Sequence, residues 1–314
     1  MAEQKIATRE AYGEALAELG RVNDQVVVLD ADLSKSTKTA VFQKSFPERF
    51  FNMGIAEQNL MGTAAGFATS GKIPFASTFA MFATGRAFEI IRNSICYPKL
   101  NVKICATHAG ITVGEDGASH QSLEDLACMR AIPNMVVINP ADAVSAKKAI
   151  FAIAEHNGPV YVRLGRASVP VLYDEKEFTF EIGKGNVLKK GKDVTIIGTG
   201  IMVAEAIKAS EILKEQGIEA RVIDIHTIKP IDQDIIIEAA SETGAIVTAE
   251  EHNIIGGLGS AVAEVLVEKK PVPMKRVGTV DTFGESGKPN DLMKKYGLTA
   301  EHIVEAVKDV LKMK

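Results

Sequence analysis

Residues 134–165 read NMVVINPADAVSAKKAIFAIAEHNGPVYVRLG, and this stretch decides the fold class. Two runs rich in β-branched residues, 134–140 and 159–165, flank a segment, 142–156, whose apolar residues recur at helical spacing. The two runs are apolar on both faces, as expected of parallel strands that are covered by helices on each side of a sheet. The stretch therefore predicts a strand, helix and strand unit of an α/β protein.

The same alternation continues on both sides of this unit and suggests two domains. It lapses after Gly165 into a charged stretch with several glycines and prolines, and it restarts at Val194. We therefore predict a first domain at 1–168, a linker or peripheral hairpin at 169–192 and a second, smaller domain at 193–314. Each domain is expected to be a mostly parallel sheet flanked by helices. The strand-like runs outside the opening stretch are 26–30, 101–109, 194–200, 220–228, 245–251 and 274–280.

Composition excludes several classes of protein. With 46% hydrophobic residues, 24% charged residues and a net charge of −4, the chain has no bias toward nucleic acid. The cysteines, Cys96, Cys105 and Cys128, have neither metal-ligand spacing nor an even number, which favours free thiols in a reducing compartment. The N-terminal region has no apolar signal segment, and the uncharged stretch 73–85 is too short to span a bilayer. We expect a cytoplasmic protein with no membrane or nucleic-acid partner.

One carboxylate occupies an unusual place. Glu57, in GIAEQN (54–59), lies between a strand-like run that ends at Met53 and an apolar helix that begins near Leu60, so we expect its side chain to be buried. A buried acid is a candidate for proton transfer. The alternative is an acid at a helix N-terminus that interacts favourably with the helix dipole.

The segment 77–93, STFAMFATGRAFEIIRN, predicts a helix that follows a short strand. Phe79 and Phe82, three residues apart, lie at the strand-to-helix turn, where open α/β sheets place their ligand crevices. They could stack on a flat heterocycle, or they could simply pack in the core.

The loop 107–122, THAGITVGEDGASHQS, is longer and more polar than a connection requires. His108 and His120 suit proton transfer near neutral pH, although the loop could also be exposed without a ligand. A zinc site is disfavoured because the histidines are far apart and no further ligand has suitable spacing. Arg166, at the end of the run 159–165, predicts contact with an anion such as a sugar phosphate.

A second motif indicates a different chemistry. GTGIMVAEA (198–206), followed by Asp224 at the end of the next run, is similar to a dinucleotide-binding fingerprint. The third glycine position of that fingerprint holds Val203, so an NAD site is disfavoured and a tight turn at a helix start is preferred.

Taken together and in this order, six motifs resemble the pyrimidine-binding domain of transketolase, and the stretch from Val194 onward resembles the transketolase C-terminal domain. The loop GEDGASHQ is the most specific of them. Related 1-deoxy-D-xylulose-5-phosphate synthases and β subunits of 2-oxo acid dehydrogenases share the fold but differ in this loop. The motifs are DADLSKST (30–37), GIAEQN, STFAMF (77–82), THAGITVGEDGASHQ, NPADAVSA (139–146) and VRLGRAS (162–168).

This resemblance implies a role for thiamine diphosphate. Glu57 would hold a proton against the aminopyrimidine ring and drive the opposite amino group into its imino form, which deprotonates the thiazolium carbon. A buried, neutral carboxyl group suits that role because it can donate a hydrogen bond. Phe82 would stack on the pyrimidine with Phe79 beside it, whereas the third aromatic residue of the family falls on Gly85. His120 would lie near the cofactor's amino group and the reacting hydroxyl of the substrate.

The resemblance also implies a substrate site. Asp116 would recognise the hydroxyl configuration of the donor sugar, and Arg9, Ser36, His108 and Arg166 would hold the sugar phosphate. Asp32 would lie near the thiazolium side of the cofactor and the subunit contact.

The metal and diphosphate half of a transketolase is missing from the pattern. It would show GDG and, about thirty residues later, an asparagine-containing turn, and this chain has no such pair. The resemblance therefore implies the C-terminal, small subunit of a split transketolase, whose N-terminal partner subunit would hold Mg²⁺ or a similar ion and the diphosphate in a heterotetramer. The reaction would be transfer of a two-carbon ketol unit between sugar phosphates. The alternatives are a subunit of another thiamine diphosphate enzyme, a non-catalytic binding module and an NAD-dependent enzyme.

Overall fold

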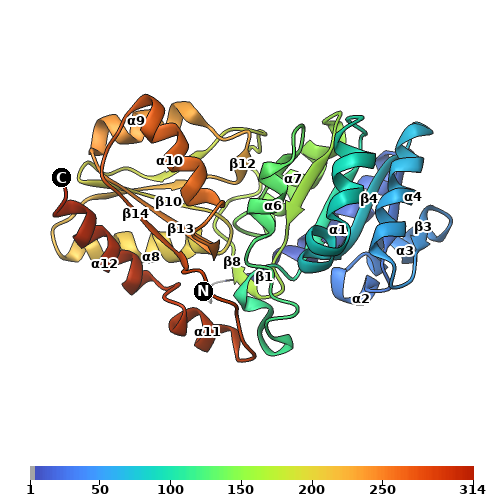
Figure 1. Cartoon of the computed structure of the whole chain (residues 1–314), viewed down its shortest axis with the longest axis horizontal. Coiled ribbons are helices and arrows are strands. Elements are labelled where there is room, and N and C mark those ends of the chain that lie inside the picture. The colour runs from blue at the N-terminus through green and yellow to red at the C-terminus, as the bar shows by residue number, and fades with distance from the viewer. Residues whose placement is uncertain (1–3) are drawn as a thin grey trace.

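The computed structural model describes residues 4–314 and contains two α/β lobes side by side (Figure 1). The N-terminal lobe is built on a seven-stranded sheet and the C-terminal lobe on a five-stranded sheet. This is the predicted fold class, with two domains whose largely parallel sheets are flanked by helices. The domain limits at 168 and 193 stay a prediction.

The seven-stranded sheet is parallel except at one edge. Its strands, in spatial order, are β12 (Thr227–Lys229), β6 (Val136–Ile138), β7 (Val160–Arg163), β5 (Lys103–Thr107), β4 (Ile73–Phe79), β2 (Val26–Asp30) and β3 (Phe50–Asn52). The edge strand β12 is antiparallel to β6 and comes from the C-terminal half of the chain. The predicted single strand at 220–228 is therefore wrong: the chain bends after β11 (Ala220–Asp224), and its continuation joins the other lobe's sheet.

Helices cover both faces of this sheet. On one face α1 (Thr8–Val22) and α7 (Ala143–Glu155) bury residues such as Tyr12, Leu16 and Ile150 against β2 and β4. Helix α7 begins where the sequence indicates, because Asp142 and Ser145 form a capping box. The other face is covered by α4 (Glu57–Thr69), by the segments η2 (Phe82–Arg86), α5 (Phe88–Ile90) and η3 (Ile91–Cys96), and by α6 (Asp125–Ala131).

The five-stranded sheet has the order β14 (Met274–Thr279), β13 (Ile246–Asn253), β10 (Val194–Gly198), β11 and β9 (Asn186–Lys189), with β9 antiparallel. Helices α8 (Met202–Glu215) and α12 (Ala300–Leu311) lie on one side, and α9 (Gln233–Thr243) and α10 (Leu258–Lys269) lie on the other (Figure 1). One apolar cluster runs from Leu60 and Ile104 in the first lobe through Ile228 to Ile236 and Val262 in the second. The two lobes therefore share a core.

The remaining elements are short. Strand β1 (Lys5–Ala7) pairs with β8 (Ser168–Pro170), so the stretch expected to be a linker begins at a strand and contains β9 near its end. The loops carry α2 (Ser34–Thr37), α3 (Ala40–Ser45), η1 (Pro47–Arg49), η4 (Ile111–Asp116) and α11 (Pro289–Lys295). The three cysteines are free, and burial raises the pKa of Cys96 and of Cys105 to about 12. Within residues 4–314, no helix has the length and apolar character needed to cross a bilayer.

Candidate functional site

The carboxyl ends of four neighbouring parallel strands bring the candidate residues to one edge of the first sheet. Asp30 of β2 is paired with Ser77 of β4, and Phe79 of β4 is paired with Thr107 of β5, so these strands end at nearly the same level. The loops after β2, β4, β5 and β7 therefore leave from the same edge. They carry Asp32, Phe82, His108, His120, Asp116 and Arg166.

Glu57 is buried, as the sequence predicts. It is the first residue of α4, and its side chain is only 2% exposed. Its Oε2 lies 2.9 Å from Nη1 of Arg86, whose side chain is 53% exposed. The acid thus has a partner outside its own helix, and its position at the start of α4 is not its whole role. Sequence reasoning did not single out Arg86 as its partner, because the two residues are far apart in the chain.

Four rings form a cluster that Arg86 connects to this acid, because its guanidinium group lies 5.1 Å from the Phe82 centroid. Phe79 and Phe82 are stacked with centroids 5.9 Å apart, and the ring of His120 meets Phe82 edge-on at 5.3 Å. Phe79 is buried because its ring also stacks on His108 at a centroid distance of 3.8 Å. Phe82 is only partly buried, so it is the ring that can accept a flat ligand, and Phe79 supports it from behind.

The segment after β4 is not the regular helix that the sequence predicts. Residues 82–86 and 91–96 are π-helical turns, in which hydrogen bonds reach one residue further than in an α-helix. Gly85 lies in the first of these turns, and a Cβ atom there would lie 2.6 Å from the methyl group of Met81. The position at which the family has an aromatic residue thus has no room for a side chain unless Met81 moves.

His108 is buried and held in one tautomer. Its Nε2 lies 3.3 Å from Nη1 of Arg9, and its Nδ1 lies 2.9 Å from Oγ1 of Thr107. Because a guanidinium group only donates, Nε2 accepts and Nδ1 carries the hydrogen. Burial lowers the pKa of His108 to about 3, and the positive charges of Arg9 and Arg166 act in the same direction. The ring is therefore neutral near pH 7 and adds no charge to an anion site.

Arg9 and Arg166 supply the positive charge on this side of the site. Nη1 of Arg9 donates to the backbone carbonyl of Ser36 at 2.9 Å, so Ser36 fixes Arg9 through its main chain. Burial lowers the pKa of Arg9, and the charge of Arg166 lowers it further. Arg166 donates to the carbonyl of Val113 and forms an ion pair with the exposed Glu115 at 3.2 Å. Two guanidinium groups close enough to repel each other favour a bound anion.

The two remaining acids lie at the rim. Asp32 is exposed, has a φ of 63° and accepts a hydrogen bond from the side-chain amide of Asn52 at 2.8 Å. A positive φ in a residue other than glycine is uncommon and marks a constrained loop. Asp116 is exposed at the end of η4. The structure thus brings both acids to the same edge as Phe82 and His120, although neither contacts Glu57.

Comparison with protein families gives two matches. Residues 4–171 match "Transketolase, pyrimidine binding domain", and residues 183–303 match "Transketolase, C-terminal domain". The chain belongs to the transketolase family.

Individual relatives agree with this assignment. The chain is 58% identical over 309 residues to a "Putative transketolase C-terminal section" from Methanocaldococcus jannaschii, covering 97% of this chain and 96% of the relative. It is 40% identical to the human protein named "Transketolase" but spans only 49% of its length. A solved structure titled "Split gene transketolase, inactive beta4 tetramer" is 63% identical, superposes with a TM-score of 0.93 and covers 98% of this chain and 99% of its own.

The transketolase family implies thiamine diphosphate, and the described residues fit its pyrimidine half. A buried carboxylate, Glu57, is linked through Arg86 to the partly exposed ring of Phe82, which has His120 at its edge. Such a set can bind a flat ring that carries nitrogen donors and acceptors. No group of three or more His, Cys, Asp or Glu side chains within 4–314 is arranged to hold a metal ion.

In this transketolase family member, the C-terminal lobe anchors the site loop. Oε1 of Glu251, in β13, accepts a hydrogen bond from the backbone N–H of Thr112 at 2.7 Å. Gly110 has a φ of +83°, and a Cβ atom there would lie 2.2 Å from the Glu251 carboxyl group. Gln121 donates to the carbonyl of Glu285 at 3.0 Å. Sequence reasoning missed these contacts, because no local motif reveals which distant strand supports a loop.

The dinucleotide-like turn of the second lobe is filled by protein. A Cβ atom at Gly200 would lie 2.6 Å from the side-chain amide of Asn139, which comes from the first lobe. Asp224, the acid that would hold a ribose, accepts a hydrogen bond of 2.7 Å from the hydroxyl of Tyr173. The turn is therefore packed inside the transketolase fold, and the geometry speaks against an NAD site there.

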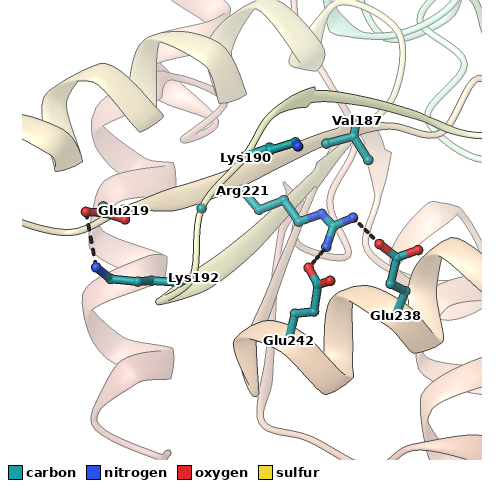
Figure 2. Close-up of a pocket in the computed structure, with 8 residues that line it drawn as sticks. Val187, Lys190, Lys192, Glu219, Arg221, Glu238 and Glu242 are labelled. Atoms are coloured by element: carbon teal, nitrogen blue, oxygen red, sulfur yellow. Dashed lines mark hydrogen bonds and ion pairs between the residues drawn. The ribbon is translucent and has the colours of Figure 1, made fainter.

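A cavity of about 570 Å³ lies elsewhere, between β9, β11 and α9 (Figure 2). Most of its charges are paired within the chain: Arg221 binds Glu242 and, at 2.8 Å, Glu238, and Lys192 binds Glu219 at 3.3 Å. None of the residues predicted to form the transketolase site lines it.

Proposed function

We propose that this chain is the C-terminal, small subunit of a split, thiamine diphosphate-dependent transketolase and binds the aminopyrimidine half of the cofactor. The observation that carries the proposal is a linked set: Arg86 contacts both the buried acid Glu57 and the ring of Phe82, and His120 meets that ring edge-on. When bound, the cofactor supplies the electron sink for transfer of a two-carbon ketol unit.

The residues of this chain divide the remaining work. Glu57 forms a hydrogen bond to a nitrogen of the pyrimidine ring and shares the proton of that bond with it. Phe82 fixes the plane of the ring, and Phe79 holds both Phe82 and His108 in place. His120, whose Nδ1 lies 3.0 Å from the hydroxyl of Ser119, is oriented to exchange a proton with the reacting hydroxyl of the substrate.

The substrate anion would bind at the two cations. Arg9 and Arg166 hold the sugar phosphate, with Ser36 and the neutral His108 as the groups that position Arg9. Asp116 recognises the hydroxyl configuration of the donor sugar. Asp32 lies toward the thiazolium side of the cofactor and toward the subunit contact. Two arginines at the rim favour a phosphorylated sugar over a 2-oxo acid, which would need no second anion site.

The diphosphate and its Mg²⁺ or similar ion would be held by a separate N-terminal subunit. Two observations support this. The chain matches only about half of the length of the human relative, and the names of two other relatives describe a C-terminal section and a split gene. The active form would be a cytoplasmic heterotetramer of two copies of each chain, with the cofactor between the two kinds of subunit.

The test is calorimetric titration of thiamine diphosphate with Mg²⁺ into this chain alone and into its mixture with a diphosphate-domain partner, with a ketol-transfer assay on the same samples. We expect binding and turnover only in the mixture. Tight binding and activity with the single chain would overturn the split assignment.

A further inference from the structure

We propose that Arg86 is a positioning residue that holds Glu57 by one carboxylate oxygen and turns the other oxygen toward the pyrimidine ring. This inference rests on the proposed role of Glu57 in binding that ring. It adds a residue that the family resemblance does not assign.

The first observation is that Arg86 engages one oxygen only. Its Nη1 donates to Oε2 of Glu57 at 2.9 Å. Among the described residues Oε1 has no hydrogen-bond partner and is not fully enclosed, so it is available to a ligand. A carboxylate tied at one oxygen cannot rotate freely, and its second oxygen keeps a fixed direction.

The second observation is that the guanidinium group is itself held in place. Its Cζ lies 5.1 Å from the centroid of the Phe82 ring, in cation–π range, and the backbone carbonyl of Arg86 accepts a hydrogen bond of 3.3 Å from Gln58. Arg86 also ends the π-helical turn that contains Gly85. Arg86 thus links the acid to the aromatic face that the ring needs.

The consequence concerns the direction of one hydrogen bond. Arg86 is the charged group in contact with Glu57 among the described residues, and it occupies Oε2. The second oxygen is thereby left for a ring nitrogen, in an orientation that Arg86 sets.

Cofactor affinity measures this directly. Calorimetric titration of thiamine diphosphate with Mg²⁺ into the complex of this chain and its partner gives Kd for the cofactor. Arg86→Gln should raise this Kd by about 10-fold, because the carboxylate oxygen that meets the ring is no longer held in one direction. Arg86→Lys keeps the charge on a more flexible side chain, so its Kd should lie between those of the wild type and Arg86→Gln. It takes the place of Arg86→Gln if that variant does not fold.

The control is Arg92→Gln, which removes the same charge from an exposed position in η3. We expect it to match the wild type. Equal cofactor affinity of the wild type and the Arg86 variant tested would overturn the proposed role of Arg86 while leaving the split enzyme intact. Absence of cofactor binding by the wild-type complex would overturn the proposed function and this inference with it.

Discussion

The two sheets of this protein share a design but differ at the carboxyl ends of their strands. In the first lobe that edge carries Glu57, Phe82 and His120 around a face that can still take a ligand. In the second lobe the corresponding turn is closed by Asn139, and Asp224 is bound to Tyr173.

The difference teaches that α/β topology supplies a place for a ligand and that side chains decide whether it is used. Asn139 comes from the first lobe, and Tyr173 from the stretch between the lobes, so the second crevice is filled by packing that joins the two lobes.

The largest expected effect comes from removing the acid of the open crevice. Glu57→Gln should lower kcat of the reconstituted complex by about 10²–10⁴-fold, because the carboxylate that exchanges a proton with the cofactor is lost. Steady-state kinetics with a ketose phosphate measure it. Asp224→Asn, the matched change in the filled crevice, should leave kcat unchanged. If both variants lose activity equally, the contrast between the crevices is wrong.

The next effect concerns the substrate anion. Arg9→Gln and Arg166→Gln should each raise KM for a sugar phosphate by about 10–100-fold, because each loses a charge-assisted hydrogen bond. KM for a ketose without phosphate should change little. Arg21→Gln, in the last turn of the same helix as Arg9 and exposed, is the control. A parallel rise for both kinds of substrate would argue against an anion site.

A smaller effect should appear in the filled crevice as pH-dependent stability. Burial raises the pKa of Asp224 to about 7, the Tyr173 hydroxyl opposes this, and the charge of Asp142 adds to it. The folded chain holds the proton of Asp224 more tightly than the unfolded chain does. The contribution of Asp224 to the free energy of unfolding therefore falls as pH rises from about 4 to about 7 and then levels off.

Asp224→Asn should therefore lose less stability over this range than the wild type, by about 1–4 kcal/mol, in denaturant unfolding followed at several pH values. Asp234→Asn, whose side chain is 89% exposed, is the control. An unchanged pH dependence in Asp224→Asn would show that the acid is not protonated in the fold.

The smallest effect tests whether the second crevice could be opened. Asn139→Ala removes the amide that closes the turn at Gly200 and should destabilise the chain by about 1 kcal/mol in thermal unfolding. A calorimetric titration with NAD should still show no binding, because Tyr173 continues to occupy Asp224. Measurable NAD binding would mean that the side chain of Asn139 alone keeps the second crevice closed to a ligand.

Much of this architecture could be predicted from local patterns. The apolar runs at 134–140 and 159–165 became β6 and β7, and Asp142 capped the helix between them. Strand β12 could not be predicted, because its residues continue the apolar run of β11 without a break and only tertiary packing sends them to the other sheet.

The candidate site could likewise be predicted from the sequence only in part. Burial of Glu57 followed from its place between a strand and an apolar helix, but its partner Arg86 is 29 positions away, and no periodicity links them. The π-helical turn that carries Arg86 has no local signature beyond Gly85. The neutral state of His108 also depends on contacts with Arg9 and Phe79 that only the folded chain creates.

The most direct test of the central claim is a crystal structure of this chain with a diphosphate-domain partner, thiamine diphosphate and Mg²⁺. We expect the pyrimidine ring to stack on Phe82 with a ring nitrogen within hydrogen-bond distance of Glu57, and the diphosphate and metal to be bound by the partner. A pyrimidine ring bound away from Glu57, or a metal and diphosphate held by this chain, would contradict the account.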